Sequence, residues 1–370
     1  MSELLILGTR GVPARHGGFE TLAERLALFL VQNGWDVSVY CQEDGSLAEK
    51  PREEMWQGVR RIVIPAPRLG PLSTVLFDFR CLLDAARRPG AVLVLGYNTA
   101  GFLFLPQLRG RKKFINMDGL EWKRGKWSPP AKGWLWLNER MATMTGALLI
   151  ADNPVIEQRI RRIAPRAKTI MIPYGADLVE DAPSEILGDY GLRPNDYFLV
   201  ISRLEPENSI LEMVRAFSSK PRTRKLVVIG NFDPANNQYH KTVLANSSPS
   251  VVFLGAIYDD RIVKCLRFFA WAYCHGHQVG GTNPSLVEAL GARNAAIVHD
   301  NPFNRWTAGE GQFFFKDEHS GAILFDTLDA ESGAALREKA REAAIARLAD
   351  GLTWPKVLNC YRQALAHGAS

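Results

Sequence analysis

The 370-residue sequence contains no long stretch of apolar residues and no low-complexity tract. Its most apolar segment, residues 91–106, is interrupted by Gly96, Asn98 and Gly101, whereas a membrane-spanning helix needs roughly 20 consecutive apolar residues. We expect this segment to form a buried strand followed by a short helix. The apolar residues 4–7 run directly into a glycine-rich turn, a pattern that does not fit a secretory signal.

Cysteine is scarce, and the five cysteines are scattered with no C-x-x-C pair: Cys41, Cys81, Cys265, Cys274 and Cys360. This spacing argues against a disulfide framework and a structural zinc site, and it predicts a protein of the reducing cytoplasm. A hydrophobic content of 46% and a charged content of 23% are those of a globular protein. The length indicates two domains.

Positive charge is concentrated in the first half of the chain. Residues 1–174 hold 25 Lys and Arg against 16 Asp and Glu, an excess of nine, and the remainder holds 20 against 23. The basic half is expected to face an anionic partner. Nucleic acid, an anionic membrane surface and a phosphate-bearing acceptor all satisfy this expectation, and charge alone does not choose among them.

Short apolar runs rich in β-forming residues alternate with helical patterns, which is typical of βαβ units on a parallel sheet. A helix is expected over 19–33, ended by Gly34. The predicted strands of the first half are residues 4–9, 36–41, 61–65, 91–96, 113–117, 147–151 and 169–173. The alternation then restarts, with strands predicted at 197–202, 225–230, 251–255, 271–275, 295–299 and 312–315.

The polar segment 177–196 is predicted to connect two consecutive doubly wound α/β domains, residues 1–176 and 177–353. A final helix within 354–370 is expected to pack back against the first domain. Ligands in open α/β sheets bind at the carboxyl ends of the strands. Two such domains are therefore expected to form an enzyme with a cleft between them.

The first predicted strand ends in Gly-Thr-Arg-Gly-Val-Pro (8–13), which includes Gly11, and Gly17-Gly18 open the following helix. Backbone amides beside glycines at a helix N-terminus can bind a phosphate group, so Gly11, Gly17 and Gly18 are predicted to contribute to donor binding. The alternative is a tight turn without a ligand. The spacing matches neither G-x-G-x-x-G nor the P-loop, so dinucleotide and P-loop interpretations are disfavoured.

In the second half, one strand runs into residues 202–208 and another into residues 275–288. Asn283 suits a helix N-cap and Pro284 the first helical position, which places Gly280-Gly281 at a helix N-terminus able to receive a diphosphate. Glu288 lies four residues after Pro284 on the same helical face. Its carboxylate is expected near that anion, where it can accept hydrogen bonds from a ribose.

These segments resemble the donor-site motifs of family 4 of the glycosyltransferases, which have two facing Rossmann-like domains (the GT-B fold), retain anomeric configuration and need no metal. The matching motifs recur in order from Gly8 to Glu288. The glycine-rich opening, Asp-Gly-Leu-Glu-Trp-Lys-Arg (118–124) and Arg-Leu-Glu-Pro-Glu-Asn (203–208) are most similar to a bacterial subgroup. That subgroup contains rhamnosyltransferases of cell-surface polysaccharide synthesis.

The resemblance implies roles for residues of the second domain. Arg203 would hold the donor diphosphate, Glu288 the donor ribose, and the loop Gly280-Gly281-Thr282-Asn283 the phosphate and sugar. The wider family usually has Lys where this chain has Asn208, and Glu where it has Gly280. Both departures resemble the sequence pattern of the rhamnosyltransferase subgroup. They therefore favour dTDP-L-rhamnose as the donor. Asn208 is retained in the predicted donor site.

Asp118 follows a predicted strand of the first domain and is beside Glu121, Lys123 and Arg124. A carboxylate there can orient or deprotonate an acceptor hydroxyl, and two cations can bind an acceptor phosphate. The alternative is a turn Asp within a solvated charge cluster. Asp152 and Tyr174 also end strands and are further candidates for acceptor binding, with capping or packing as their alternatives. The predicted catalytic residues are thus Asp118, Arg203 and Glu288.

His275 and His277 have a spacing that suits a metal, but no third ligand is apparent in the sequence. We favour a metal-free site in which either His donates to the donor, with a structural role as the alternative. The chain also lacks the Asp-x-Asp by which many other glycosyltransferases hold a divalent ion. Tryptophans 122, 127, 134 and 136 alternate with basic residues, which suits a membrane interface or simple core packing.

The sequence therefore predicts a cofactor-free, metal-independent glycosyltransferase at the inner face of the bacterial plasma membrane. Its expected partners are a nucleotide diphosphate-sugar donor, a lipid-linked (polyprenyl diphosphate) sugar acceptor and an anionic membrane surface, and no nucleic acid. The alternatives are a transferase that uses a UDP- or GDP-hexose, a nucleotide-sugar epimerase or phosphorylase-like enzyme of the same fold, and a non-enzymatic membrane- or nucleic-acid-binding protein.

Overall fold

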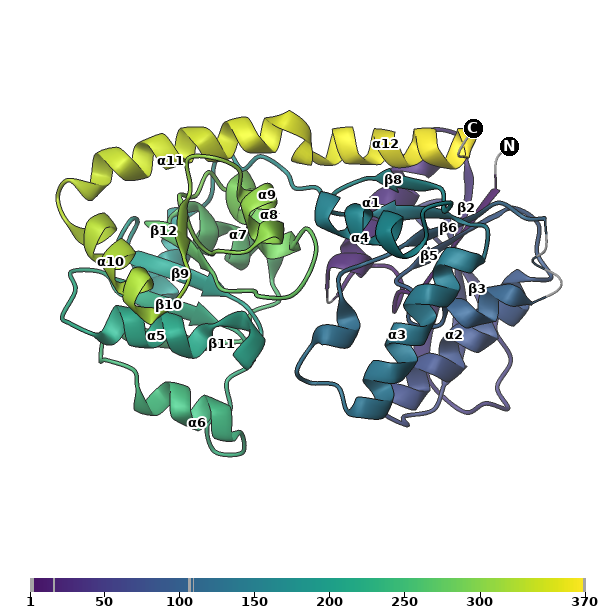
Figure 1. Cartoon of the computed structure of the whole chain (residues 1–370), viewed down its shortest axis with the longest axis horizontal. Coiled ribbons are helices and arrows are strands. Elements are labelled where there is room, and N and C mark those ends of the chain that lie inside the picture. Colours follow the sequence, from purple (N-terminus) through teal and green to yellow (C-terminus); the bar gives the residue numbers. More distant parts are fainter. Residues whose placement is uncertain (1–2, 16, 106–107, 109, 369–370) are drawn as a thin grey trace. The chain divides into compact units, whose positions relative to one another are not determined.

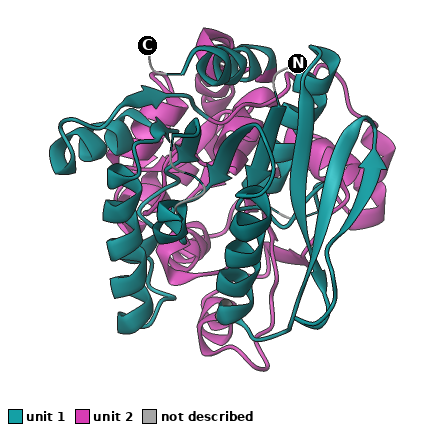
Figure 2. Cartoon of the chain, turned by 90° about the vertical axis from the view of Figure 1, so that its right-hand side faces the viewer, with its two compact units in different colours: residues 1–173, 355–370 teal, residues 174–354 magenta. Residues whose placement is uncertain are grey.

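The computed structural model describes residues 3–15, 17–105, 108 and 110–368 (Figure 1). The chain divides into two compact units. Unit 1 consists of residues 1–173 together with 355–370, and unit 2 of residues 174–354, as Figure 2 shows by colour. Unit 1 is therefore discontinuous in sequence, because the chain leaves it for unit 2 and then returns.

Unit 1 is built on an eight-stranded sheet of order β3-β4-β2-β1-β5-β6-β7-β8, in which only β3 is antiparallel. Both faces of the central strands are covered, since residues 4–7 of β1 are all buried, as expected of a parallel sheet. The strands are β1 (Glu3–Leu7), β2 (Asp36–Asp44), β3 (Arg52–Trp56), β4 (Val59–Ala66), β5 (Ala91–Leu95), β6 (Lys113–Asn116), β7 (Leu148–Ala151) and β8 (Thr169–Met171).

The helices of unit 1 follow the expected alternation with the strands. They are α1 (Gly18–Gln32), α2 (Pro71–Ala85), α3 (Pro129–Met144), α4 (Pro154–Ile163) and α12 (Trp354–His367), with short 3-10 helices η1 (Ala100–Phe104) and η3 (Glu121–Lys123). Segment 91–106 begins as the expected buried strand and short helix, although residue 106 lies outside the described residues.

Strand β3 was missed by the sequence analysis. It forms a hairpin with β4 through Gln57 and Gly58, both with positive φ (47° and 82°), as the type I′ two-residue turn requires. Its sequence, Arg-Glu-Glu-Met-Trp, shows little apolar alternation, because β3 is an exposed edge strand stabilised by charge pairs such as Arg61 to Glu54 (2.6 Å). An edge strand of this kind carries no clear hydrophobic pattern.

Unit 2 contains a six-stranded, fully parallel sheet of order β11-β10-β9-β12-β13-β14. Alternate residues of each strand enter two separate cores: Phe198 and Val200 of β9 pack into one, and Tyr197 and Leu199 into the other. The strands are β9 (Tyr197–Ile201), β10 (Lys225–Ile229), β11 (Val251–Gly255), β12 (Ala272–His275), β13 (Ala296–His299) and β14 (Phe313–Phe315).

Helices cover both faces of this sheet, so unit 2 is doubly wound as predicted. They are α5 (Ile210–Ser218), α6 (Gln238–Ala245), α7 (Asp260–Phe268), α8 (Pro284–Gly291), α9 (Pro302–Ala308), α10 (Glu318–Asp329) and α11 (Gly333–Arg347), with shorter turns η4 (Ser184–Tyr190), η5 (Pro206–Asn208) and η6 (Leu348–Leu352). Segment 177–196, interpreted from its polarity as a connection, lies at the start of unit 2 and places Ala182, Leu187 and Leu192 in one of its cores.

In each unit the strand order reverses beside the first strand. β1 lies between β2 and β5, and β9 lies between β10 and β12. At such a switch point the connections leave toward opposite faces of the sheet and open a crevice at the strand carboxyl ends. The segments after β1 and β5 in unit 1, and after β9 and β12 in unit 2, are therefore the places to look for ligand sites.

Candidate active site

The two loops at the switch point of unit 2 are bound to each other. Ser209 Oγ donates to the carbonyl of Gly276 (2.8 Å), and Gln278 Nε2 donates to Ser209 Oγ (2.9 Å). A Cβ at Gly276 would lie 2.1 Å from the carbonyl oxygen of Asn208, so only glycine permits this approach. Residues 202–209 and 276–283, recognised separately in the sequence, thus form one structural unit.

Arg203 projects from the first of these loops and is exposed. Its backbone carbonyl accepts hydrogen bonds from Asn208 Nδ2 (2.8 Å) and Ser202 Oγ (3.0 Å). Within the described part of the chain no carboxylate forms an ion pair with its guanidinium. Asn208 is buried, and its side-chain amide stabilises the loop that presents Arg203.

Glu288 lies on α8 and forms an ion pair with Arg267 of α7, with Nη2 2.5 Å from Oε2. Arg267 is buried and also donates to Ser285 Oγ (3.4 Å), which is 2.6 Å from the hydroxyl of Tyr273. The carboxylate of Glu288 is therefore held in one orientation by a cation beneath it. Arg267 was not identified from the sequence, because nothing in a separation of 21 residues indicates that the two side chains meet.

The N-terminus of α8 has the predicted form. Asn283 is the N-cap and its Oδ1 accepts from the backbone amide of Ser285 (3.0 Å), while Pro284 is the first helical residue. Gly280, Gly281 and the buried Thr282 lead into this cap. The amides of Ser285, Leu286 and Val287 are bonded to Asn283, so it is the positive end of the helix dipole that favours an anion at this position.

His275 ends β12 with only 1% of its surface exposed. Burial lowers the pKa of His275 well below its usual value, so the imidazole is neutral. Neither of its ring nitrogens has a hydrogen-bond partner among the residues the structure describes. Its ring stacks on that of His277, with centroids 4.4 Å apart. Among the described residues, no three His, Cys, Asp or Glu side chains lie together so that they could hold a metal ion.

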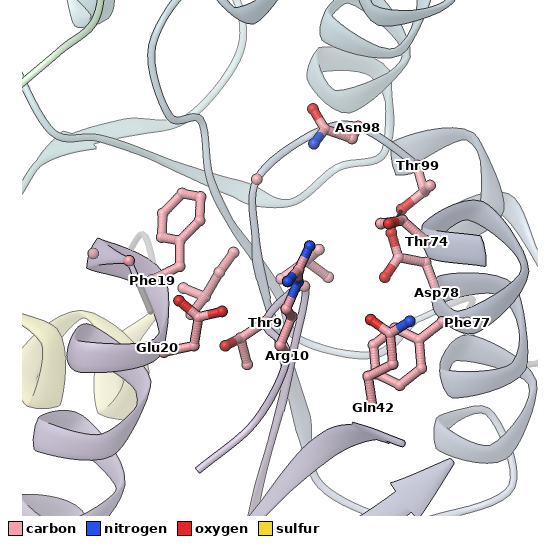
Figure 3. A pocket seen from close by; sticks show the side chains of 16 residues that line it. Thr9, Arg10, Phe19, Glu20, Gln42, Thr74, Phe77, Asp78, Asn98 and Thr99 are labelled. Atoms are coloured by element: carbon pink, nitrogen blue, oxygen red, sulfur yellow. Dashed lines mark hydrogen bonds between the residues drawn. The ribbon is translucent and has the colours of Figure 1, made fainter. Parts of the chain in front are cut away.

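The glycine-rich turn of unit 1 serves two purposes. A Cβ at Gly11 would lie 2.6 Å from Cys41 Sγ, so Gly11 is required for packing against β2. Gly17 is the N-cap of α1 and Gly18 its first residue, and both line a pocket of about 290 Å³ at the switch point of unit 1 (Figure 3).

Asp118 follows β6 with a positive φ of 52°. Its amide donates to Asn116 Oδ1 (3.0 Å), and Asn116 Nδ2 donates to the hydroxyl of Tyr361 on α12 (2.8 Å). Asn116 and Tyr361 are buried, so α12 helps to hold the Asp118 turn. Burial and the nearby carboxylate of Glu121 raise the pKa of Asp118 to about 6.

The charged residues after Asp118 already have intramolecular partners. Arg124 Nε lies 2.5 Å from Oε1 of the buried Glu121. The Lys123 ammonium lies 5.7 Å from the ring centroid of Trp122. The two cations expected to bind an acceptor phosphate are therefore not equivalent, since Arg124 is neutralised by Glu121 and Lys123 keeps a net charge.

The two further acceptor candidates lie in different units. Asp152 follows β7 in unit 1. Tyr174 begins unit 2, and its buried ring packs edge to face on Trp354 at a centroid distance of 4.8 Å.

Comparison with known proteins agrees with this architecture. Residues 190–347 match the family described as glycosyl transferases group 1, and residues 1–177 match a domain of unknown function, DUF1972. No curated protein matches the chain. The fold and the family match together identify a glycosyltransferase with the GT-B fold, whose unit 2 carries the group 1 domain.

Solved structures similar to the whole chain include sucrose-phosphate synthase from Thermosynechococcus elongatus, with a TM-score of 0.80 and 16% identity over 99% of this chain and 100% of that one. Another is the α,α-trehalose 6-phosphate synthase from Burkholderia multivorans, with a TM-score of 0.72 and 13% identity over 99% of this chain and 96% of that one. A third is the UDP-forming α,α-trehalose-phosphate synthase from Burkholderia xenovorans, in complex with glucose-6-phosphate. Its TM-score is 0.69, with 12% identity over 99% of this chain and 100% of that one. At these identities the likeness shows the fold alone.

Proposed function

We propose that this glycosyltransferase binds a nucleotide diphosphate-sugar in unit 2 and transfers its sugar to an acceptor hydroxyl. The observation that carries the proposal is the gathering of an exposed Arg203, a fixed Glu288 carboxylate and the N-terminus of α8 around two joined loops. Negative charge develops on the departing nucleotide diphosphate, and Arg203 and the positive end of the α8 dipole stabilise it. Glu288 accepts hydrogen bonds from the ribose.

The first candidate donor is dTDP-L-rhamnose, transferred with retention. It is supported by Asn208 and Gly280, which stand where the wider family usually has Lys and Glu. One similar structure is a UDP-forming enzyme, so a UDP-hexose is the second candidate. An epimerase or phosphorylase of this fold is disfavoured by the group 1 match, as is a protein without catalytic activity.

A donor panel tests this function. The protein is incubated with dTDP-L-rhamnose and with UDP- and GDP-hexoses in the presence of bacterial membrane extract, and the lipid products are analysed by mass spectrometry. We expect one donor to add one sugar mass to a lipid-linked saccharide. If no donor yields a product, and calorimetry detects no binding of dTDP, UDP or GDP, the proposed function is wrong.

Metal removal is expected to leave transfer unchanged. The charge of the leaving diphosphate is assigned to Arg203 and the α8 N-terminus, and no Asp-x-Asp is present in the sequence. Transfer is measured after exhaustive treatment with EDTA and again after addition of manganese or magnesium. Loss of transfer in EDTA that either ion restores would contradict metal independence.

For the acceptor we propose a polyprenyl diphosphate-linked sugar at the inner face of the plasma membrane. The excess of nine positive charges in residues 1–174 suits a diphosphate and an anionic leaflet. Asp118, with a pKa of about 6, is largely ionised near neutral pH and suited to orient an acceptor hydroxyl or accept its proton. A soluble sugar phosphate is the second candidate, since a related structure contains glucose-6-phosphate.

Helix α3 offers a surface for such a membrane. Its solvent-facing side exposes Trp136 (42%), Leu137 (47%) and Met144 (72%), and the Arg140 guanidinium lies 3.5 Å from the Trp136 ring centroid. Apolar and aromatic side chains beside a cation suit the interface of an anionic bilayer. We therefore propose docking through this α3 face. Among the described residues, no helix is long and apolar enough to span a membrane.

Changing this face is expected to weaken membrane binding. The double variant Trp136→Ser, Leu137→Ser removes two apolar side chains whose burial in lipid stabilises binding by roughly 1.5–3 kcal/mol each. We expect the affinity for anionic vesicles at low salt, measured by sedimentation, to fall at least about tenfold. The matched control is Met55→Ser, which removes a 68% exposed apolar side chain of the same unit. Equal sedimentation of both variants and the wild type would contradict docking through α3.

A further inference from the structure

The pocket at the switch point of unit 1 contains a buried acid that the sequence analysis did not single out. Asp78 of α2 is 9% exposed and lines this pocket together with Thr74, one helical turn earlier, and Thr99, which follows β5. Figure 3 shows Asp78 and Thr99 on one side of the pocket, with Arg10 nearer its middle. A buried acid is expensive in free energy unless it has a purpose or a partner.

The contacts of Asp78 leave part of its carboxyl group unused. Thr99 Oγ1 donates to Asp78 Oδ2 at 2.9 Å. The other oxygen, Oδ1, accepts no hydrogen bond from the residues that the structure describes, and no cation among them pairs with the carboxyl group. Thr99 is itself buried, so the pair is fixed in the wall of the pocket.

The chemistry of the pocket selects among possible ligand groups. An anionic group against Asp78 would be repelled by the carboxylate, and a cationic group would share the pocket with the guanidinium of Arg10. A neutral hydroxyl suits both residues, because it donates to a carboxylate and accepts from a guanidinium. Burial raises the pKa of Asp78 to about 7, so near neutral pH the group can both accept and donate, as hydroxyl binding requires.

We propose that Asp78 and Thr99 bind a hydroxyl group of the acceptor sugar, and that this pocket of unit 1 is the subsite for a neutral, hydroxylated sugar residue. The inference rests on the proposed transfer function and names the residues that recognise its acceptor. Asp78 is a binding residue in this scheme and Arg10 a neighbour able to donate to the same sugar. Donor binding through Arg203 and Glu288 of unit 2 does not depend on either.

The test compares wild type with Asp78→Asn, which keeps the shape of the side chain and an oxygen for Thr99. With the donor identified by the panel, and membrane lipid extract as the acceptor source, initial rates are measured against extract concentration. Losing a hydrogen bond to a charged group corresponds to a rise of roughly 10- to 100-fold in the half-saturating extract concentration. Nucleotide affinity and the slow transfer of the donor sugar to water are expected to stay at wild-type values.

Two further variants separate binding from structure. Thr99→Val keeps the shape but removes the hydroxyl, and a smaller rise in half-saturation is expected. Asp84→Asn removes another carboxylate of α2, one bonded to Tyr40 (2.8 Å) and Arg88 (2.5 Å) away from the pocket lining, and half-saturation should not change.

Wild-type half-saturation in a folded Asp78→Asn protein would overturn this inference and leave the transfer function standing. A parallel loss of transfer to acceptor and to water in that variant would also overturn it, because structural damage would then explain both. Absence of transfer by the wild type from every donor would instead refute the proposed function, and this inference with it.

Discussion

Replacing Asp78 with asparagine is expected to raise the free energy of unfolding of unit 1 at pH 8 by on the order of 3 kcal/mol. Burial raises the pKa of Asp78 from 3.8 to about 7 in the folded protein. A shift of about 3 pKa units corresponds to roughly 4 kcal/mol, and the unpaired NH₂ of asparagine offsets about 1 kcal/mol of it. The variant would thus be more stable and poorer at using its acceptor.

The pH dependence has a definite sign. Because the folded state holds the proton of Asp78 more tightly than the unfolded chain does, its stabilising contribution is complete below about pH 4 and is lost as pH rises through about 7. The advantage of the variant should therefore grow between pH 4 and 7 and stay constant above. Urea unfolding at pH 5 and pH 8, followed by tryptophan fluorescence, measures it. Parallel stability curves for the two proteins would contradict a buried, desolvated Asp78.

Arg203→Ala is expected to reduce kcat/KM for transfer by about 10- to 150-fold with little change in stability. Loss of a charge-assisted contact to phosphate costs roughly 1.5–3 kcal/mol. Arg203 is exposed and its loop is held through its backbone carbonyl, so the side chain contributes little to the fold. Steady-state kinetics with the identified donor, and calorimetric binding of the free nucleotide, provide the measurement.

Arg261→Ala is the matched control, because it removes an exposed guanidinium from α7 in the same unit. Near-normal transfer by a folded Arg203→Ala protein would refute the donor-site assignment. Glu288, the other predicted donor-binding residue, is less suitable for this test. Its removal leaves the buried Arg267 without its carboxylate, and an uncompensated buried charge is strongly destabilising.

Local sequence patterns predicted those structural features that depend on residues close together in the chain. The alternation of apolar runs located every parallel strand of both sheets, and Asn283-Pro284 located the start of α8. Arg267 could not be assigned, since its meeting with Glu288 depends on how α7 and α8 pack. Asp78 did leave a signal, an acid between two phenylalanines in the apolar helix 71–85. Its place in a pocket, however, depends on Thr99, which follows β5 and meets Asp78 only in the folded unit.

The return of the chain to unit 1 has a consequence for how the protein is made. Unit 2 is complete at residue 354, before helix α12 has been synthesised. Until then the buried amide of Asn116 lacks the Tyr361 hydroxyl, and the turn of Asp118 lacks that support. On the ribosome, where domains generally fold as they emerge, unit 2 can therefore mature first. The half that carries Asp118 is finished only when translation has passed through residue 361.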